Sequence, residues 1–351
     1  MRTDELDAEL ARLHAERDFS GTLLITESGG PVFEAHVGLA DRAADVPIGP
    51  RTRFALGSVT KLFTAVAVLS LVAEGAFALD APVIGILPPE RRPATLRADV
   101  TVRHLLAHTS GIADYFEEET ATENWPEEYA ALWHDRPLYR MREPADFLPL
   151  YGDLPPYRAP GGRFQYSNAG YLLLGLVVEE AAGTGYTEAV DARVFGPAGM
   201  GDSGFFAADE VRPDVAVGYL RPSEPGGLWR TNLFSVPIIG GADGGAFATS
   251  RDLDRFFSAY AAGELVKPPL LAEALREHGR IGERAAMGLG AYLIGEGPGR
   301  AIGSEGGDPG AEAVIRHYPE RGVNTIVLSN VNSETRRADR ALRSFMGLGE
   351  Q

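Results

Sequence analysis

The sequence predicts a mixed α/β (α+β) fold: an antiparallel sheet flanked by helices, with a mostly helical domain inserted into the chain. Segments with the β-rich pattern of strands occur near both ends of the 351 residues, at 20–40 and 299–331. The residues between them have mostly helical patterns, broken by many Pro and Gly residues. The simplest architecture is a sheet domain built from both chain ends, a helical domain between them, and a cleft where the two meet.

The N-terminal part predicts a helix, a hairpin and a second helix. Segment 1–21 carries acidic residues and lacks an apolar run of signal-peptide length, so we expect an amphipathic helix rather than a secretory signal. Segments 20–27 and 31–40 are β-rich and flank a Ser-Gly-Gly turn signal, which predicts a hairpin. The most apolar stretch, 62–79, contains a glutamate and a glycine and is shorter than the ~20 residues that span a bilayer. We expect it to be a buried core helix.

The C-terminal part predicts three strands and a final helix. Turn signals separate the strand-like segments 299–307, 311–318 and 323–331, which therefore form an antiparallel meander. A helix then begins at about Ser333, a suitable N-cap, and ends at Met346, before a glycine.

The domain division follows from these patterns. We place a discontinuous sheet domain at residues 1–65 and 235–351, and a mostly helical domain at 66–234. The segments with helical patterns in that insertion are 104–108, 123–135, 144–154 and 169–183.

Composition excludes several functions. The formal net charge of −16 would repel phosphate backbones and anionic lipid, so we expect neither a nucleic acid nor a membrane partner. The chain has no cysteine, which excludes a disulfide, a thiolate nucleophile and a cysteine-ligated metal. A cytoplasmic location is expected, and the oligomeric state stays open. Only two of the 33 basic residues are lysine, Lys61 and Lys267, and the others are arginine. Arginine stays charged, whereas lysine can lose its proton and serve as a neutral base.

Ser58 and Lys61 form the first candidate catalytic pair. Ser58 precedes the apolar helix and Lys61 lies one turn further along the same face, so their side chains can meet. Ser58 taken alone is equally well explained as an N-cap. The helix dipole disfavours a cation in the first helical turn, so placing Lys61 there costs about 0.3–1 kcal/mol. A desolvated lysine near a positive helix end can lose its proton and activate a serine hydroxyl, which is the functional interpretation of this pair.

The segment Tyr166-Ser167-Asn168 is the second candidate constellation. It lies between a Pro-Gly-Gly turn and a strongly apolar helix, so it can face the cleft. A tyrosine beside an ammonium group is expected to have a lowered pKa, and Tyr166 could then relay a proton from Ser58 to the leaving group. Asn168 could hold Lys61 or a substrate carbonyl. The alternative is a helix-capping Asn168 beside a core tyrosine.

An SxxK motif, a YxN motif roughly a hundred residues later and a Gly-rich strand near the C-terminus resemble the serine β-lactamases and penicillin-binding proteins. The tyrosine variant is similar to class C enzymes and family VIII carboxylesterases. Further similar stretches are 104–111, 160–162, 195–200 and 244–253. The resemblance implies a β-lactamase/transpeptidase-like fold and an acyl-enzyme mechanism, in which Ser58 attacks the substrate while Tyr166 and Lys61 move the proton.

The third motif departs from the family pattern of Lys-Thr-Gly or His-x-Gly. The aligned residues are Ser304, Glu305 and Gly306, so the cation is missing. Strand alternation directs Glu305 away from the face of its two neighbours, so it does not replace that charge. In the family the cation helps to bind a substrate carboxylate, so its absence disfavours a β-lactam or a D-Ala-D-Ala peptide here. The alternative is that Arg300 or Arg316 supplies the charge from nearby. The resemblance also implies an oxyanion hole formed by the backbone amides of Ser58 and Gly307.

Other chemistries find less support. His104 and His108 have the helical spacing of a zinc pair, but leucine follows His104 where HExxH requires glutamate, so we expect no metal. Neither a GxGxxG nor a phosphate loop stands in the required context, so we expect no nucleotide and no cofactor. No GxSxG elbow supports a Ser-His-Asp triad.

We therefore expect a serine hydrolase that forms an acyl-enzyme at Ser58, with Lys61 and Tyr166 catalytic and with Asn168, Ser304, Gly306 and Gly307 binding substrate. The expected partner is a small-molecule or peptide ester or amide without a recognised carboxylate. The alternatives are a β-lactamase or D-Ala-D-Ala carboxypeptidase, an acyltransferase of the same fold, and a noncatalytic ligand-binding relative.

Overall fold

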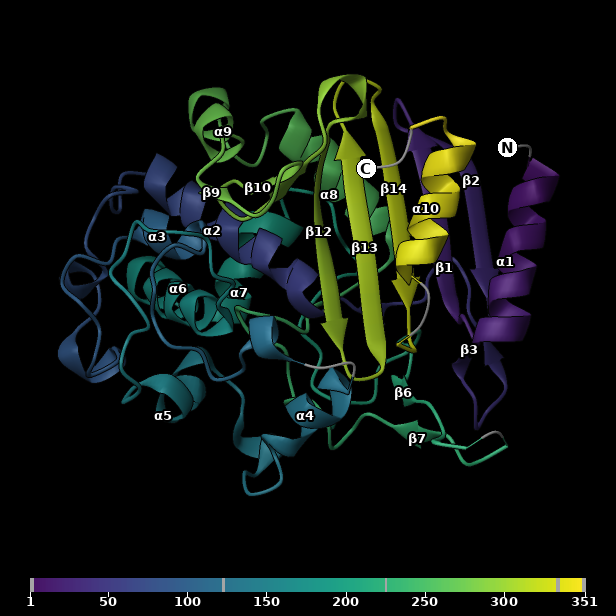
Figure 1. Cartoon of the computed structure of the whole chain (residues 1–351), viewed down its shortest axis with the longest axis horizontal. Helices are drawn as coiled ribbons and strands as arrows, with labels where there is room; N and C mark the ends of the chain where they lie inside the picture. Colours follow the sequence, from purple (N-terminus) through teal and green to yellow (C-terminus); the bar gives the residue numbers. More distant parts are fainter. Residues whose placement is uncertain (1–2, 122–123, 225, 333–334, 349–351) are drawn as a thin grey trace.

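The computed structural model describes residues 3–121, 124–224, 226–332 and 335–348. Its central element is an eight-stranded sheet with the order β2-β1-β14-β13-β12-β11-β10-β9, in which neighbouring strands are antiparallel. Its strands are β1 (Gly21–Glu27), β2 (Gly30–Val37), β9 (Gly279–Arg280), β10 (Ala285–Met287), β11 (Tyr292–Ile294), β12 (Ala301–Asp308), β13 (Ala311–Tyr318) and β14 (Val323–Ser329). The N-terminal hairpin thus pairs directly with the last strand, and both chain ends build one sheet (Figure 1).

The remaining elements are helices and short strand pairs. The helices are α1 (Thr3–Arg17), α2 (Thr60–Ala73), α3 (Val102–Leu106), α4 (Trp125–Ala131), α5 (Leu148–Tyr151), α6 (Asn168–Ala182), α7 (Tyr186–Val190), α8 (Ser250–Ala261), α9 (Pro268–Ala274) and α10 (Thr335–Phe345). A short 3₁₀ helix, η1 (Gly57–Val59), leads into α2. The strand pairs are β3 (Leu39–Asp41) with β4 (Val46–Pro47), β5 (Phe54–Ala55) with β8 (Phe247–Ala248), and β6 (Tyr219–Leu220) with β7 (Arg230–Thr231).

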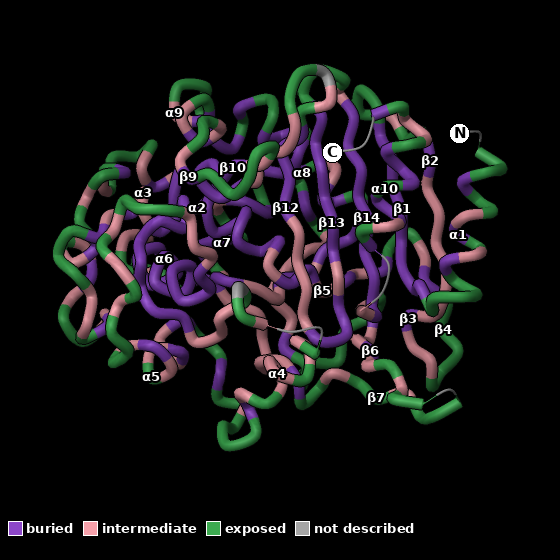
Figure 2. The backbone as a smooth tube through the Cα atoms, viewed as in Figure 1, coloured by how far each residue is buried: buried purple, intermediate pink, exposed green. Residues whose placement is uncertain are grey.

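Side-chain alternation gives the sheet two apolar faces. Leu23 and Ile25 of β1 pack in a cluster with α1 and α10, whereas Leu24 between them belongs to the larger core that contains α2, α6 and α8. Figure 2 shows buried backbone in the central strands and in α2 and α6, with exposed backbone along α1. The sheet therefore separates a small outer layer from a helical layer that carries the candidate catalytic residues.

The two apolar helices α2 and α6 pack against each other in the helical layer. Every residue of α2 from Thr60 to Leu69 is buried, as expected for a helix that is apolar on all sides. Helix α6 begins where the side chain of Ser167 accepts a hydrogen bond from the amide of Gly170, at 3.0 Å. In the described residues, no helix is both long enough and apolar enough to cross a membrane.

The structure confirms the predicted fold class, the N-terminal hairpin and the C-terminal meander. The helix predicted over 62–79 was wrong in its bounds, because α2 ends at Ala73 and Gly75 lies in the turn that follows. Strands β9 to β11 were not predicted, because they are only two or three residues long and have no sustained alternation. The predicted N-cap Ser333 lies outside the described residues, and the domain boundaries stay a prediction.

Candidate active site

Ser58 lies in the short helix η1, immediately before α2. The side chain of Ser58 does not cap the helix. Instead, Lys61 Nζ contacts Ser58 Oγ at 2.9 Å. The neighbouring Thr60 hydroxyl donates to the carbonyl of Gly57. The sequence spacing of three residues therefore brings the two predicted side chains together. Ser58 also lines the large cavity of the protein, so its hydroxyl is accessible from the cleft.

Lys61 is buried and is surrounded by oxygen acceptors. Its Nζ donates to Asn168 Oδ1 at 2.7 Å and to the backbone carbonyl of Asp243, besides its contact with Ser58. Burial lowers the pKa of Lys61 from its ordinary value, although the carboxylates of Asp243 and Glu118 oppose this shift. This confirms the predicted direction of the pKa shift of Lys61. The neutral amine therefore forms at a lower pH than in an exposed lysine.

The three oxygen partners of Lys61 Nζ fit both protonation states, because a charged lysine has three N–H donors for them. An uncharged amine has two N–H donors and one lone pair. If the donors serve Asn168 Oδ1 and the Asp243 carbonyl, the lone pair is left for the hydroxyl proton of Ser58. This is the arrangement that a general base requires.

Tyr166 also lies beside the nucleophile, since both it and Ser58 line the cavity and Lys61 Nζ lies 4.9 Å from its ring centre. The expected lowering of its pKa was wrong. Burial raises the pKa of Tyr166 well above its ordinary value, and the nearby carboxylate of Glu118 adds to this effect. Tyr166 is therefore a neutral phenol at rest, able to pass a proton but not to hold a negative charge before substrate binds.

Asp114 positions Asn168, and the sequence analysis did not identify it. Its buried carboxylate accepts hydrogen bonds from the backbone amides of Asn168 at 2.6 Å, Ala169 at 3.1 Å and Tyr115 at 2.7 Å. Two of these amides belong to the first turn of α6, where a negative charge is favourable. Burial nevertheless raises the pKa of Asp114 to about 7. Asp114 lies 54 residues from Asn168, so no local pattern links them.

His108 supports Tyr166 from the side of the ring. Its imidazole stacks on the Tyr166 ring with centroids 4.5 Å apart, and its Nδ1 accepts from the amide of Ser167 at 3.0 Å. Burial lowers the pKa of His108 well below its ordinary value, and nearby Lys61 lowers it further. His108 is thus a neutral structural support. In the described part of the chain, no cluster of three or more metal-binding side chains occurs.

Glycines allow strand β12 to lie directly against the nucleophile. A Cβ atom at Gly306 would lie 2.0 Å from the carbonyl oxygen of Leu56 and 2.8 Å from the amide nitrogen of Ser58. Gly57 has a φ of +51°, and a Cβ there would lie 2.8 Å from the amide nitrogen of Gly307. The amides of Ser58 and Gly307, which the resemblance assigns to the oxyanion hole, are therefore in adjacent backbone segments.

The third motif lies on an open strand edge. Strand β11 pairs with β12 only as far as Gly303, so the following residues have no strand partner on that side among the described residues. Ser304 is buried and does not line the cavity, so its role in substrate binding stays a prediction. Glu305 forms ion pairs with Arg316, at 2.5 Å, and with Arg336 of α10, at 2.9 Å. Each of these two arginines therefore has a carboxylate partner.

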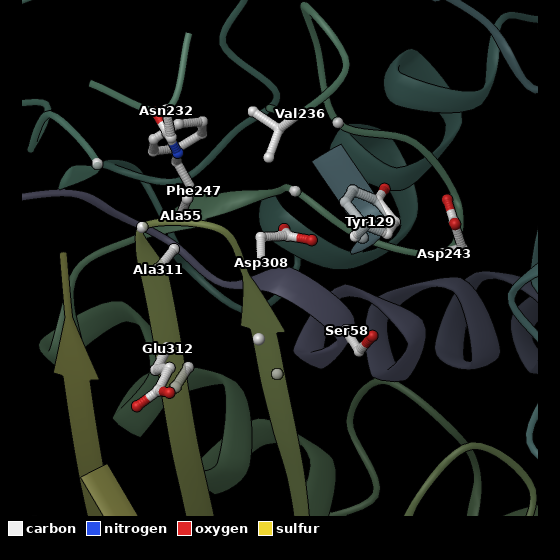
Figure 3. A pocket seen from close by; sticks show the side chains of 18 of the residues that line it. Ala55, Ser58, Tyr129, Asn232, Val236, Asp243, Phe247, Asp308, Ala311 and Glu312 are labelled. Atoms are coloured by element: carbon white, nitrogen blue, oxygen red, sulfur yellow. The ribbon is translucent and has the colours of Figure 1, made fainter. Parts of the chain in front are cut away.

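The cleft is a cavity of about 1220 Å³ (Figure 3), and five of the predicted site residues line it. These are Ser58, Tyr166, Asn168, Gly306 and Gly307. Its wall also carries aromatic and acidic side chains that the sequence analysis did not assign to the site, namely Trp125, Tyr129, Phe247, Glu118, Asp243 and Asp308.

The comparisons with known proteins agree with this geometry. The model of the Beta-lactamase family matches residues 6–345. The chain is 33% identical to esterase EstB of Burkholderia gladioli over 368 residues, covering 96% of this chain and 87% of that protein. It is 29% identical to penicillin-binding protein 4* of Bacillus subtilis, covering 92% of this chain and 70% of that protein. A crystal structure of a penicillin-binding protein from Bacillus halodurans superposes with a TM-score of 0.88 at 36% identity, covering 96% of this chain and 99% of that chain.

The chain therefore belongs to the β-lactamase family, and it is a serine hydrolase. This confirms the family, the fold and the enzyme class that the three sequence motifs indicated.

Proposed function

We propose that this protein hydrolyses a carboxylic ester or amide through an acyl-enzyme at Ser58, and that its substrate lacks a carboxylate at the position where related enzymes bind one. The observation that carries the proposal is the contact of the buried Lys61 amine with Ser58 Oγ at 2.9 Å. A serine hydroxyl needs such a base to become an effective nucleophile.

The first half of the reaction is acylation. Neutral Lys61 accepts the hydroxyl proton while Ser58 Oγ forms a bond to the carbonyl carbon of the substrate. The resulting oxyanion accepts hydrogen bonds from the backbone amides of Ser58 and Gly307, and each such donor can lower the barrier by about 2.7–4 kcal/mol. The bond to the leaving group then breaks, and the proton passes through the Tyr166 hydroxyl to the departing alcohol or amine.

The second half is deacylation. Water takes the position of the leaving group, loses a proton through Tyr166 to Lys61, and attacks the acyl carbon. The bond to Ser58 breaks and its oxygen recovers the proton from the lysine, so the enzyme returns to its starting state. An alcohol or amine that replaced the water would give an acyl transfer instead.

Two observations support an ester or amide without a recognised carboxylate. The relative EstB is named an esterase and aligns along most of its length. In addition, the position of the usual third-motif cation is Ser304, and the nearby Arg316 and Arg336 are paired with Glu305. Within the part of the chain that the structure describes, neither of these two arginines is therefore an unpaired cation at this position on β12.

The test compares hydrolysis of p-nitrophenyl acetate, p-nitrophenyl butyrate and nitrocefin by the wild type and by Ser58→Ala. We expect ester turnover that falls by about 10³-fold or more in the variant, with slow or no nitrocefin cleavage. Fast nitrocefin cleavage would show that the third motif does not exclude β-lactams. Mass spectrometry with a fluorophosphonate should find one adduct, on Ser58, and failure to label or to hydrolyse any ester would favour the noncatalytic alternative.

A further inference from the structure

Asp308, the last residue of β12, lies on the same face of the strand as Gly306. Side chains two residues apart in a strand share a face, and the Gly306 position contacts Ser58 directly. Asp308 directly follows Gly307, whose amide is the expected oxyanion donor. The Cα atoms of the two residues are therefore ~3.8 Å apart. Figure 3 shows the Asp308 carboxylate directed into the cavity, on the side of Tyr129 and Ser58.

This carboxylate has no side-chain hydrogen bond or ion pair within the described residues, although it is only partly exposed. The other acidic side chains of the cavity differ from it. Asp243 accepts from the hydroxyl of Tyr115 at 2.5 Å, and Glu118 accepts from Asn168 Nδ2 at 3.2 Å. Asp308 is thus available to a ligand, whereas those carboxylates are occupied.

The surrounding charges make this part of the cavity negative. Burial, together with the neighbouring carboxylates of Asp243 and Glu118, raises the pKa of Asp308 to about 7, although Lys61 opposes this shift. A ligand cation would relieve this unfavourable environment, and a ligand carboxylate would worsen it.

The wall beside Asp308 is apolar and aromatic. Tyr129 and Phe247 line the same cavity. Aromatic faces of this kind bind alkyl groups and also stabilise ammonium groups. The wall therefore fits the organic part of an amphipathic amine.

We propose that Asp308 is a specificity-determining residue that binds a protonated amine on the substrate, close to the scissile carbonyl. The substrate class is then an ester or amide of an amino acid or similar amino-acyl compound with a free amino group. This inference rests on the proposed hydrolase function and adds the charge of the substrate to it.

The test measures binding without turnover, by calorimetry on the Ser58→Ala protein. The probes are phenylalanine amide, as both enantiomers, and 3-phenylpropionamide, which has the same skeleton without the amine. We expect at least one enantiomer to bind about 10-fold or more tightly than the des-amino amide, the preference that one charge-assisted hydrogen bond supplies. Adding Asp308→Asn should remove this preference.

The matched control is Glu210→Gln in the same background. Glu210 is an exposed carboxylate that lines the same cavity but forms an ion pair with Arg212 at 2.7 Å. It should leave the amine preference intact. Circular dichroism melting of each variant shows whether the fold is retained, and Asp308→Glu, which keeps the charge, serves if Asp308→Asn does not fold: it should keep a preference for the amine.

Equal binding of the amine and the des-amino amide, or a preference that Asp308→Asn leaves unchanged, would overturn the inference. Neither result would touch the proposed function, which fails separately if the wild type shows no Ser58-dependent hydrolysis of p-nitrophenyl esters.

Discussion

The imidazole of His108 stacks on the phenol ring of Tyr166, with an interplanar angle of 25°. His108 has a φ of +54°, a conformation that most side chains disfavour, and its Nδ1 accepts the amide proton of Ser167. The residue thus fixes both the ring and the backbone of the YxN segment, and it does so as an uncharged acceptor.

Replacing His108 should therefore impair catalysis although His108 does not touch substrate. We expect His108→Leu to lower kcat for p-nitrophenyl acetate by about 10-fold or more and to lower the free energy of unfolding by about 1–3 kcal/mol, because a buried amide loses its acceptor. His108→Asn, which keeps an acceptor and tolerates positive φ, should retain more of both. Steady-state kinetics and denaturant unfolding would check this, and equal damage by the two substitutions would contradict it.

Lys61→Arg should be inactive, because a guanidinium stays protonated and cannot accept the Ser58 proton. We expect a loss of about 10²–10⁴-fold in kcat/KM, the range of general-base catalysis. A correctly folded variant with near wild-type activity would refute the role of Lys61. Lys267→Arg is the matched control, since it changes the other lysine, at the N-cap of α9, and should leave turnover unchanged.

The pH dependence should report the lowered pKa of Lys61. Because the neutral amine is the active form, kcat/KM should rise with pH and level off above the Lys61 pKa, which lies below the ordinary 10.5. Hydrolysis of p-nitrophenyl acetate measured from pH 5 to 10, with Ser58→Ala as the blank, tests this. A rate that falls as pH increases across this range would indicate that the charged lysine is the active form.

Tyr166→Phe should keep the stack on His108 but remove the hydroxyl that passes the proton. We expect kcat to fall by about 10²-fold or more while the melting temperature changes little. The loss should be larger for an anilide than for a p-nitrophenyl ester, because the amine leaving group needs protonation and p-nitrophenolate does not. Equal losses for both substrates would place Tyr166 outside the proton path.

Gly306→Ala tests the close approach of β12 to the nucleophile. The added Cβ would lie 2.0 Å from one backbone atom and 2.8 Å from the Ser58 amide, so the strand or η1 must move. We expect the loss of about 10²–10³-fold in kcat that accompanies a displaced oxyanion donor. Gly49→Ala is the control, since no atom lies within 4 Å of its added Cβ, and it should behave as the wild type.

Much of the fold followed from local patterns, because the strands at both chain ends and the helices α2 and α6 are long and regular. The Ser58 and Lys61 pair was predictable for the same reason, since helix geometry alone brings residues three apart together. The third motif was recognised by resemblance, not by geometry. The short strands β9 to β11 lack enough residues for any period to appear.

The supporting residues of the site could not be predicted, because they act across long sequence separations. Asp114, His108 and Asp243 reach their partners over 54, 59 and 182 residues. The pKa of Tyr166 was predicted in the wrong direction for a related reason. Its charge partner was visible in the sequence motif, whereas its burial depends on the assembled core.

The acceptors around Lys61 also have a consequence for how activity appears during folding. They come from residues 58, 168 and 243, so the lysine finds its partners only after distant segments have docked. Before that point, burying the amine would leave its N–H donors without acceptors, which costs free energy. A partly folded state with a buried Lys61 is therefore unfavourable. Recovery of ester turnover after dilution from denaturant should therefore trail the recovery of helical signal, which makes enzymatic activity a stringent reporter of complete native assembly.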